Sequence, residues 1–165
     1  MNPFRKCHGA WLALLLPLAG LALADGPRLP PLQNQLWQQE CGSCHLAYHP
    51  GLLPAASWTA VMDGLGHHFG SDASLAADEE AALRRFLTAH AGTGKQGRAA
   101  AGQDGKPLLR ISQMPWFRHE HSEELPPGVW TRKEVGSPAN CAACHGDAAS
   151  GRFSEREIRV PGGRR

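Results

Sequence analysis

Two pentapeptides of one pattern, at residues 41–45 and 141–145, constrain this chain more than any other feature. In a Cys-x-x-Cys-His run, cysteines three apart lie on one side of a helical turn and can form thioethers with the two vinyl groups of one haem. The histidine, four residues after the first cysteine, comes up beneath the ring and can bind the iron. The pattern therefore predicts two covalently bound haem c groups per chain, with attachment through Cys41, Cys44, Cys141 and Cys144 and proximal iron ligands His45 and His145.

Two other uses of paired cysteines compete with this interpretation. Two Cys-x-x-Cys pairs can hold one zinc ion, but here the pairs are 100 residues apart and a histidine follows each. A redox-active dithiol needs the strand and helix of a thioredoxin-like fold, which the flanking sequence does not indicate. The spacing favours haem over both.

The N-terminus reads as a secretory signal. Basic residues 5–6 precede an apolar run at 11–23, which ends at a small-residue cleavage site at Ala24. The alternative is an uncleaved anchor, but the run is shorter than the ~20 apolar residues that a membrane span needs. We predict that residues 1–24 are removed together with Cys7, leaving a periplasmic protein without stable membrane insertion.

Composition predicts a thin side-chain core. The 141 residues after the signal (165 minus 24) suffice for one ordinary domain or two very small ones, and Gly 19 with Pro 13 indicates much irregular chain. Two buried haems supply the missing apolar bulk. Residues 25–92 carry three basic and seven acidic groups, against twelve and eight in residues 93–165. This charge asymmetry could help the two halves dock on each other or steer a partner protein. The alternative is that the charged residues only form a solvated surface. The charges do not indicate nucleic-acid binding.

Hydrophobic periodicity predicts short helices in the N-terminal half. The first is expected over 34–40, leading into the first motif, and a proline-rich loop over 47–54 then wraps the haem edge. Ser57 is expected to cap a helix whose apolar face runs through Phe69, and a further helix is expected over 74–89.

The C-terminal half begins after a segment without periodicity. We predict an all-α fold with much irregular loop, in which two small haem-binding halves, 25–92 and 108–165, are joined by a flexible linker at 93–107. In the second half, Ser112 is expected to cap a short helix, and another helix is expected around Cys141. The elements expected beyond these are an extended stretch at 108–111, a turn at 126–128, and a basic, frayed tail at 151–165.

The remaining histidines are candidates for the distal iron ligands. His68 extends an apolar helix face, and His121 lies four residues after Phe117 on the same face. We predict His68 for the first haem and His121 for the second, with His90 as the runner-up. The less favoured alternatives are His49, His67, His119, Met62 and Met114. Two histidines per iron give six-coordinate, low-spin haem with no open position, which suits electron transfer.

Several runs together resemble the bacterial dihaem cytochrome c family, over roughly residues 35–160. These runs are 40–45, 48–58, 68–75, 116–121, 140–145 and 151–153. The resemblance implies a periplasmic electron-transfer protein with two bis-histidine c-type haems, in which His68 and His121 match the distal ligands. It also implies redox partners such as an oxygen-binding monohaem cytochrome or a membrane cytochrome b.

The main functional hypothesis is therefore an electron carrier and not an enzyme. The alternative is a haem enzyme or gas-binding protein with one five-coordinate iron, in which His67, His119 or Arg118 serves as a distal group. A third possibility, a haem subunit that docks in a membrane complex, differs from the first only in its partners.

Overall fold

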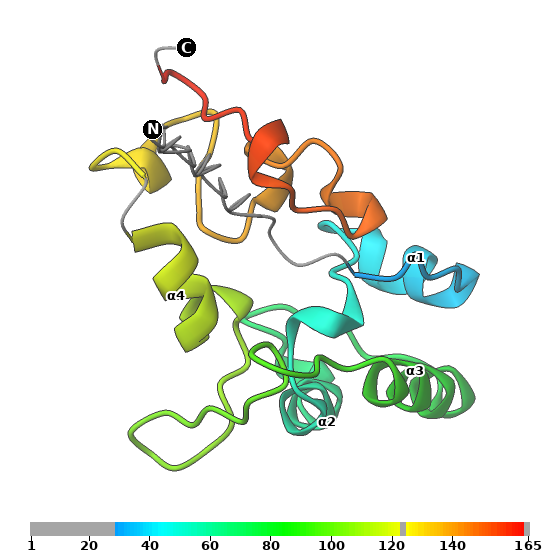
Figure 1. The fold of residues 1–165 in the computed structure, drawn as a ribbon. Helices are drawn as coiled ribbons and strands as arrows, with labels where there is room; N and C mark the ends of the chain where they lie inside the picture. Colours follow the sequence, from blue (N-terminus) through cyan, green and yellow to red (C-terminus); the bar gives the residue numbers. More distant parts are fainter. Residues whose placement is uncertain (1–28, 123–124, 164–165) are drawn as a thin grey trace, which may run out of the picture.

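The computed structural model describes residues 29–122 and 125–163 (Figure 1). Within these ranges the chain is helical, with short 3₁₀ turns and long loops, and only isolated bridges instead of strands. The predicted fold class, all-α with much irregular loop, is confirmed. The predicted signal peptide, with its cleavage site and Cys7, lies outside the described residues, as do the last two residues of the tail.

Helix α1, Gln35–Gly42, brings the chain to the first motif. It begins one residue after the start expected at 34, because Asn34 is its cap. The Asn34 side chain accepts a hydrogen bond from the Trp37 amide at 2.9 Å and so satisfies one of the free N–H groups of the first turn. Trp37 is the one residue of α1 that is buried, and it anchors the helix on the core. The helix ends one residue after Cys41, so its last turn carries the first of the cysteines predicted to attach haem.

Helix α2, Ala55–Asp63, differs from the predicted helix at both ends. It begins after Pro54, where a missing N–H costs nothing, and the predicted cap Ser57 is instead fully buried inside the helix. The helix ends at Asp63, because the next residue, Gly64, is a poor helix former. A 3₁₀ turn, Leu65–His67, follows. The predicted apolar face therefore does not continue into the residues after Asp63.

Helix α3, Ala77–Ala89, packs along α2. It starts three residues later than predicted, and its first turn is closed by Glu79, whose carboxylate accepts from the Ala76 amide at 3.3 Å. Leu83 and Leu87 are almost completely buried between the two helices. These helices form the lower part of the molecule in Figure 1.

Leu83 is among the most completely buried residues of the main hydrophobic cluster, so it is the residue to test for the contribution of this core to stability. Replacing Leu83, which is 0% exposed, with alanine removes three buried carbons and leaves a cavity. We expect the free energy of unfolding to fall by about 2–5 kcal/mol. Chemical denaturation of the holoprotein measures this value, with the exposed Ala56→Ser, on the outside of α2, as the control that is expected to change it little.

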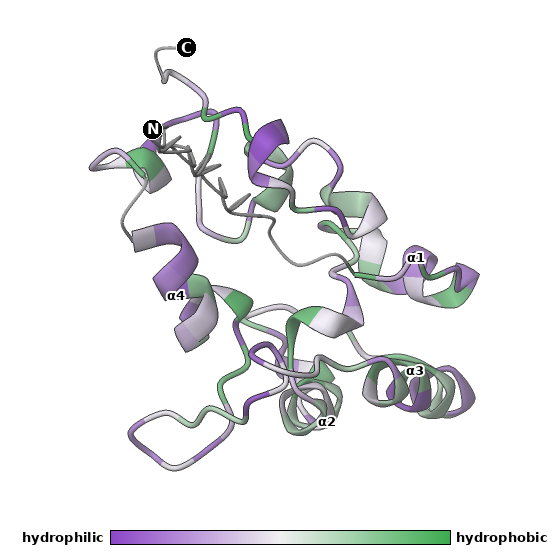
Figure 2. Ribbon diagram, viewed as in Figure 1, coloured by the Kyte–Doolittle hydropathy of each residue, from purple (hydrophilic) through white to green (hydrophobic). Residues whose placement is uncertain are grey.

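Helix α4, Pro115–Ser122, is the only α-helix among the described residues that follow α3. The predicted cap Ser112 lies in the 3₁₀ turn Ile111–Gln113 instead, and Pro115 starts the helix because its fixed φ suits the first helical position. Figure 2 colours most of α4 hydrophilic. Phe117 on α4 and Met114, the residue before the helix, nevertheless belong to the same buried cluster as Trp37 and the buried side chains of α2.

The segment 93–107 contacts the rest of the molecule at several points. The Gly92 amide, just before it, donates to the Leu53 carbonyl at 2.8 Å, and the Gln96 side chain is buried. Lys95 forms a 2.7 Å ion pair with Glu120 on α4. The division of the chain into two haem-binding halves at this segment stays a prediction.

The remaining elements are 3₁₀ turns of three residues each: Pro50–Leu52, Val129–Thr131, Cys141–Ala143, Ala148–Ser150 and Glu155–Glu157. The helix predicted around Cys141 is therefore only a single 3₁₀ turn, which covers the first three residues of the motif. The predicted frayed tail is also corrected over its described part. The Arg159 amide donates to the Cys144 carbonyl at 3.0 Å, and Ile158 forms a bridge with His145.

No helix in 29–122 or 125–163 is both long and apolar enough to cross a membrane.

Candidate haem sites

At the first motif, the structure places His68 opposite His45. The two imidazole rings are 6.2 Å apart between centroids and 28° from parallel. His45 lies just after α1, whereas His68 follows the 3₁₀ turn that replaces the predicted end of α2. The His45 Nδ1–H donates to the Leu46 carbonyl at 2.8 Å, which fixes the tautomer and leaves Nε2 free to bind iron.

A strained turn holds His68 in this position. Phe69 has φ 49°, in the left-handed region that side chains other than glycine rarely adopt, and its ring lies 4.8 Å from His68 edge to face. The Arg110 guanidinium covers the outer face of Phe69, 3.9 Å from the ring centroid. Burial, with the nearby His45 and Arg110, lowers the pKa of His68 and so favours the neutral imidazole that a metal needs.

At the second motif, the structure places His121 opposite His145. Their ring centroids are also 6.2 Å apart, but the planes are 76° from parallel. The His121 Nδ1–H donates to the Phe117 carbonyl one turn back on α4, at 2.8 Å, and its ring stacks on Phe117 at 3.9 Å. Burial lowers the pKa of His145, which again favours the neutral ring.

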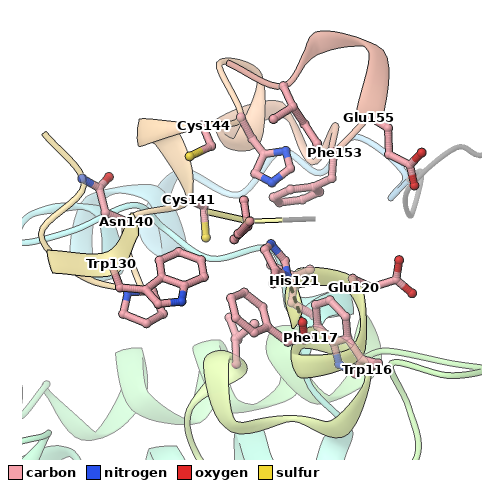
Figure 3. A pocket seen from close by; sticks show the side chains of 16 residues that line it. Trp116, Phe117, Glu120, His121, Trp130, Asn140, Cys141, Cys144, Phe153 and Glu155 are labelled. Carbon is pink, nitrogen blue, oxygen red and sulfur yellow. Dashed lines mark hydrogen bonds between the residues drawn. The ribbon is translucent and has the colours of Figure 1, made fainter. Parts of the chain in front are cut away.

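An apolar cavity surrounds this second pair of histidines. Figure 3 shows the Cys141 sulfur, the His121 ring and Phe153 around one hollow between α4 and the C-terminal turns. Its apolar walls come from four separate parts of the chain. They are Leu52, Ile111, Trp116, Phe117, Leu125, Trp130, Pro138, Phe153 and Ile158.

Cys41 and Cys141, the first cysteine of each motif, lack the lowered pKa of a reactive dithiol. All four are free, and burial raises the pKa of Cys41 and of Cys141 to about 11 each. A redox-active thiol has instead a lowered pKa, near or below neutrality. No group of three or more metal-binding side chains occurs within the described part of the chain.

The geometry of both sites fits haem. A bond from a first-row metal to an imidazole nitrogen is about 2.0–2.1 Å, and the ring centre lies roughly 1 Å further, so two axial imidazoles on one iron have centroids roughly 6 Å apart. Both observed separations match this value. Cys41 and Cys44 with His45 and His68 would hold the first haem, and Cys141 and Cys144 with His145 and His121 the second. An apolar cavity next to a cysteine pair also suits a large hydrophobic macrocycle.

The other candidate ligands lie elsewhere. His90 directly follows α3, and its Nδ1–H donates to the Phe86 carbonyl at 2.9 Å, beside a hollow that it shares with His49. His49 is buried, with one ring nitrogen bound to Pro30 and the other to the Gly51 amide. His67 and His119 are exposed, and Met62 and Met114 are core residues.

Sequence reasoning did not assign roles to several residues that surround these sites. Leu52, from the first proline-rich loop, lines the second cavity, as does Ile158 from the predicted tail. Trp130 lies 6.0 Å from the His121 ring. The sequence around these three residues has no hydrophobic periodicity that would have indicated their positions. Phe153 carried a signal only as part of the run 151–153, which resembles the family, and its ring lies 5.3 Å from His145.

Comparisons with known proteins identify the family of this chain. The family described as dihaem cytochrome c matches residues 37–153, which include both motifs and both additional histidines. No curated protein matches the chain significantly.

Solved structures of similar proteins are dihaem cytochromes. A diheme cytochrome c from Rhodobacter sphaeroides is 40% identical, and the match covers 75% of this chain and 99% of that one, with a TM-score of 0.65. A diheme cytochrome of type c from Shewanella baltica is 34% identical, with 79% and 95% covered and a TM-score of 0.66. The family implies haem-based electron transfer, and two haem c groups in each protein. With more than half of its length matched and both haem-attachment motifs present, the chain belongs to the dihaem cytochrome c family.

Proposed function

We propose that the protein is a periplasmic electron carrier that works through two six-coordinate, bis-histidine haems. The observation that carries this proposal is the pairing of each motif histidine with a second imidazole at a centroid separation of 6.2 Å. With both axial positions occupied, neither site offers the open position that oxygen or peroxide chemistry needs. Electron transfer between redox partners is the function that such sites support, without catalysis of its own.

Several side chains of the two sites have specific roles in this proposed function. The cysteines would attach the haems covalently, and the Nδ1–H bonds of His45 and His121 leave the other nitrogen of these two rings available for iron. When bound, haem supplies a one-electron redox centre whose potential depends on axial ligands and burial. The second site is lined by a mainly apolar cavity, whereas His45 and Cys44 at the first site are exposed. This difference supports two distinct potentials.

The proposed location and partners rest on the family and on the N-terminal sequence. The signal-like residues 1–24 support export to the periplasm and cleavage after Ala24. By resemblance, the partners are other redox proteins, such as an oxygen-binding monohaem cytochrome or a membrane cytochrome b. The mature N-terminus and cell fractionation test the location.

Optical spectroscopy of the purified protein tests the function itself. We expect two haems per chain, a low-spin spectrum in both redox states, and no change on addition of carbon monoxide to the reduced protein. A strong change with carbon monoxide would show an open iron position and would favour the gas-binding or enzymatic alternative instead.

The two sites are also expected to differ in electron paramagnetic resonance. The imidazole planes are 28° apart at the first site and 76° apart at the second. Near-parallel planes act on the same iron d orbital, whereas near-perpendicular planes act on two, so the ligand field differs. We therefore predict two distinct low-spin signals of equal intensity from the oxidised protein. A single signal of double intensity would contradict the different ring orientations.

A further inference from the structure

Tyr48 lies between the two haem sites and contacts both. Its ring stacks on His45, with centroids 4.9 Å apart and planes within 26°. Its hydroxyl donates a 2.6 Å hydrogen bond to the Ala139 carbonyl, 91 residues away in the sequence. Ala139 is two residues before Cys141, the first attachment point of the second haem. One side chain therefore joins the proximal ligand of one site to the peptide that leads into the other.

The acceptor of this hydrogen bond has a local function in the second motif. The Ala139 carbonyl also accepts from the Cys141 amide at 3.1 Å, which closes a tight turn immediately before the cysteine. A carbonyl oxygen has two lone pairs, so both donors can bind it together. The Tyr48 hydroxyl thus fixes the same peptide that sets the direction of the Cys141 side chain.

Tyr48 is suited to this role because a phenol hydroxyl is protonated at neutral pH and can donate a hydrogen bond. The side chain is half-buried, which limits competition from water for the hydrogen bond.

We propose that Tyr48 is a positioning residue that orients the His45 imidazole with its ring and holds the second haem site against the first with its hydroxyl. This inference rests on the proposed function, because it assumes that His45 and Cys141 belong to two haem sites. It adds to that function a physical connection that keeps the spacing of the two redox centres constant.

Two substitutions separate the two roles. Tyr48→Phe keeps the ring on His45 and removes only the hydroxyl, whereas Tyr48→Leu removes both. Thr131→Val is the matched control, because it deletes a hydroxyl that donates at 2.8 Å to the local Gly128 carbonyl and joins no two sites. All three are compared with the wild type as holoproteins.

The first readout is hydrogen exchange of the backbone amides of residues 140–145 in the reduced holoprotein. Loss of one net hydrogen bond is expected to make this exchange roughly three- to tenfold faster in both Tyr48 variants, and to leave it unchanged in Thr131→Val. Wild-type exchange rates in Tyr48→Phe would overturn the role of the hydroxyl.

The second readout is the low-spin signal of the first haem in electron paramagnetic resonance, which reports the orientation of the His45 ring. We expect it to be unchanged in Tyr48→Phe and shifted in Tyr48→Leu. An unshifted signal in Tyr48→Leu would overturn the role of the ring. Failure of the proposed function looks different, because the wild type itself would then bind carbon monoxide, independently of any Tyr48 substitution.

Discussion

Replacing His121 with alanine is expected to open the second iron to ligands. The reduced wild type should bind no carbon monoxide, and reduced His121→Ala should bind it at one iron per chain, because His121 is the side chain that faces His145 at 6.2 Å. The oxidised variant should lose one low-spin signal and gain a high-spin one. Optical titration with carbon monoxide and electron paramagnetic resonance measure both changes.

The matched control for this experiment is His119→Ala. His119 is on the same helix, two residues earlier, but is exposed to solvent. Its removal should leave both irons low-spin. The unchanged signal of the first haem shows that His121→Ala is folded, and external imidazole should restore the low-spin state. If His121→Ala stays fully low-spin while His90→Ala binds carbon monoxide, the runner-up His90 is the ligand instead.

Removing the second pair of thiols is expected to halve the haem content. In the double variant Cys141→Ser with Cys144→Ser, no covalent bond retains haem in the second site, so the haem-to-protein ratio should fall from two to one. The apolar walls around Phe153 and Trp130 then lose the group they enclose. By analogy with other covalent cross-links, the free energy of unfolding should fall by at least about 2–4 kcal/mol.

Mass spectrometry of the denatured protein measures this result, since only covalent haem survives denaturation. The control is Cys7→Ser, which changes a cysteine of the predicted signal and should leave both haems and the mature mass unchanged. Two covalent haems in the double variant would show that the second motif is not an attachment site.

Local chemistry explains which helices sequence reasoning placed correctly. The helix expected over 34–40 forms as α1, with Asn34 as its cap, because an Asn side chain before the first turn supplies the acceptor that this turn needs. The prediction for α2 failed where two signals competed. Ser57 and Pro54 are both residue types that favour a helix start. The helix begins directly after Pro54, and Ser57 is a buried residue in its first turn.

His68 was predicted as the distal ligand of the first haem from a helix face that does not extend to it in the structure. The prediction placed it on a continuous helix face, but the helix ends at Asp63, and His68 follows a 3₁₀ turn in extended conformation. Its ring nevertheless lies opposite His45, because the strained turn at Phe69 holds it there. No periodicity encodes such a turn.

The sequence by itself predicted the haem chemistry proposed for this protein, because thioether attachment and proximal ligation need only residues three and four apart in one short motif. The tertiary structure alone decided the contacts between distant segments. It brings Tyr48 to Ala139, Leu52 to the second cavity, and the segment after Gly151 over His145. Such contacts depend on how loops without periodic pattern pack against a small core, and the sequence carries no local signal for that packing.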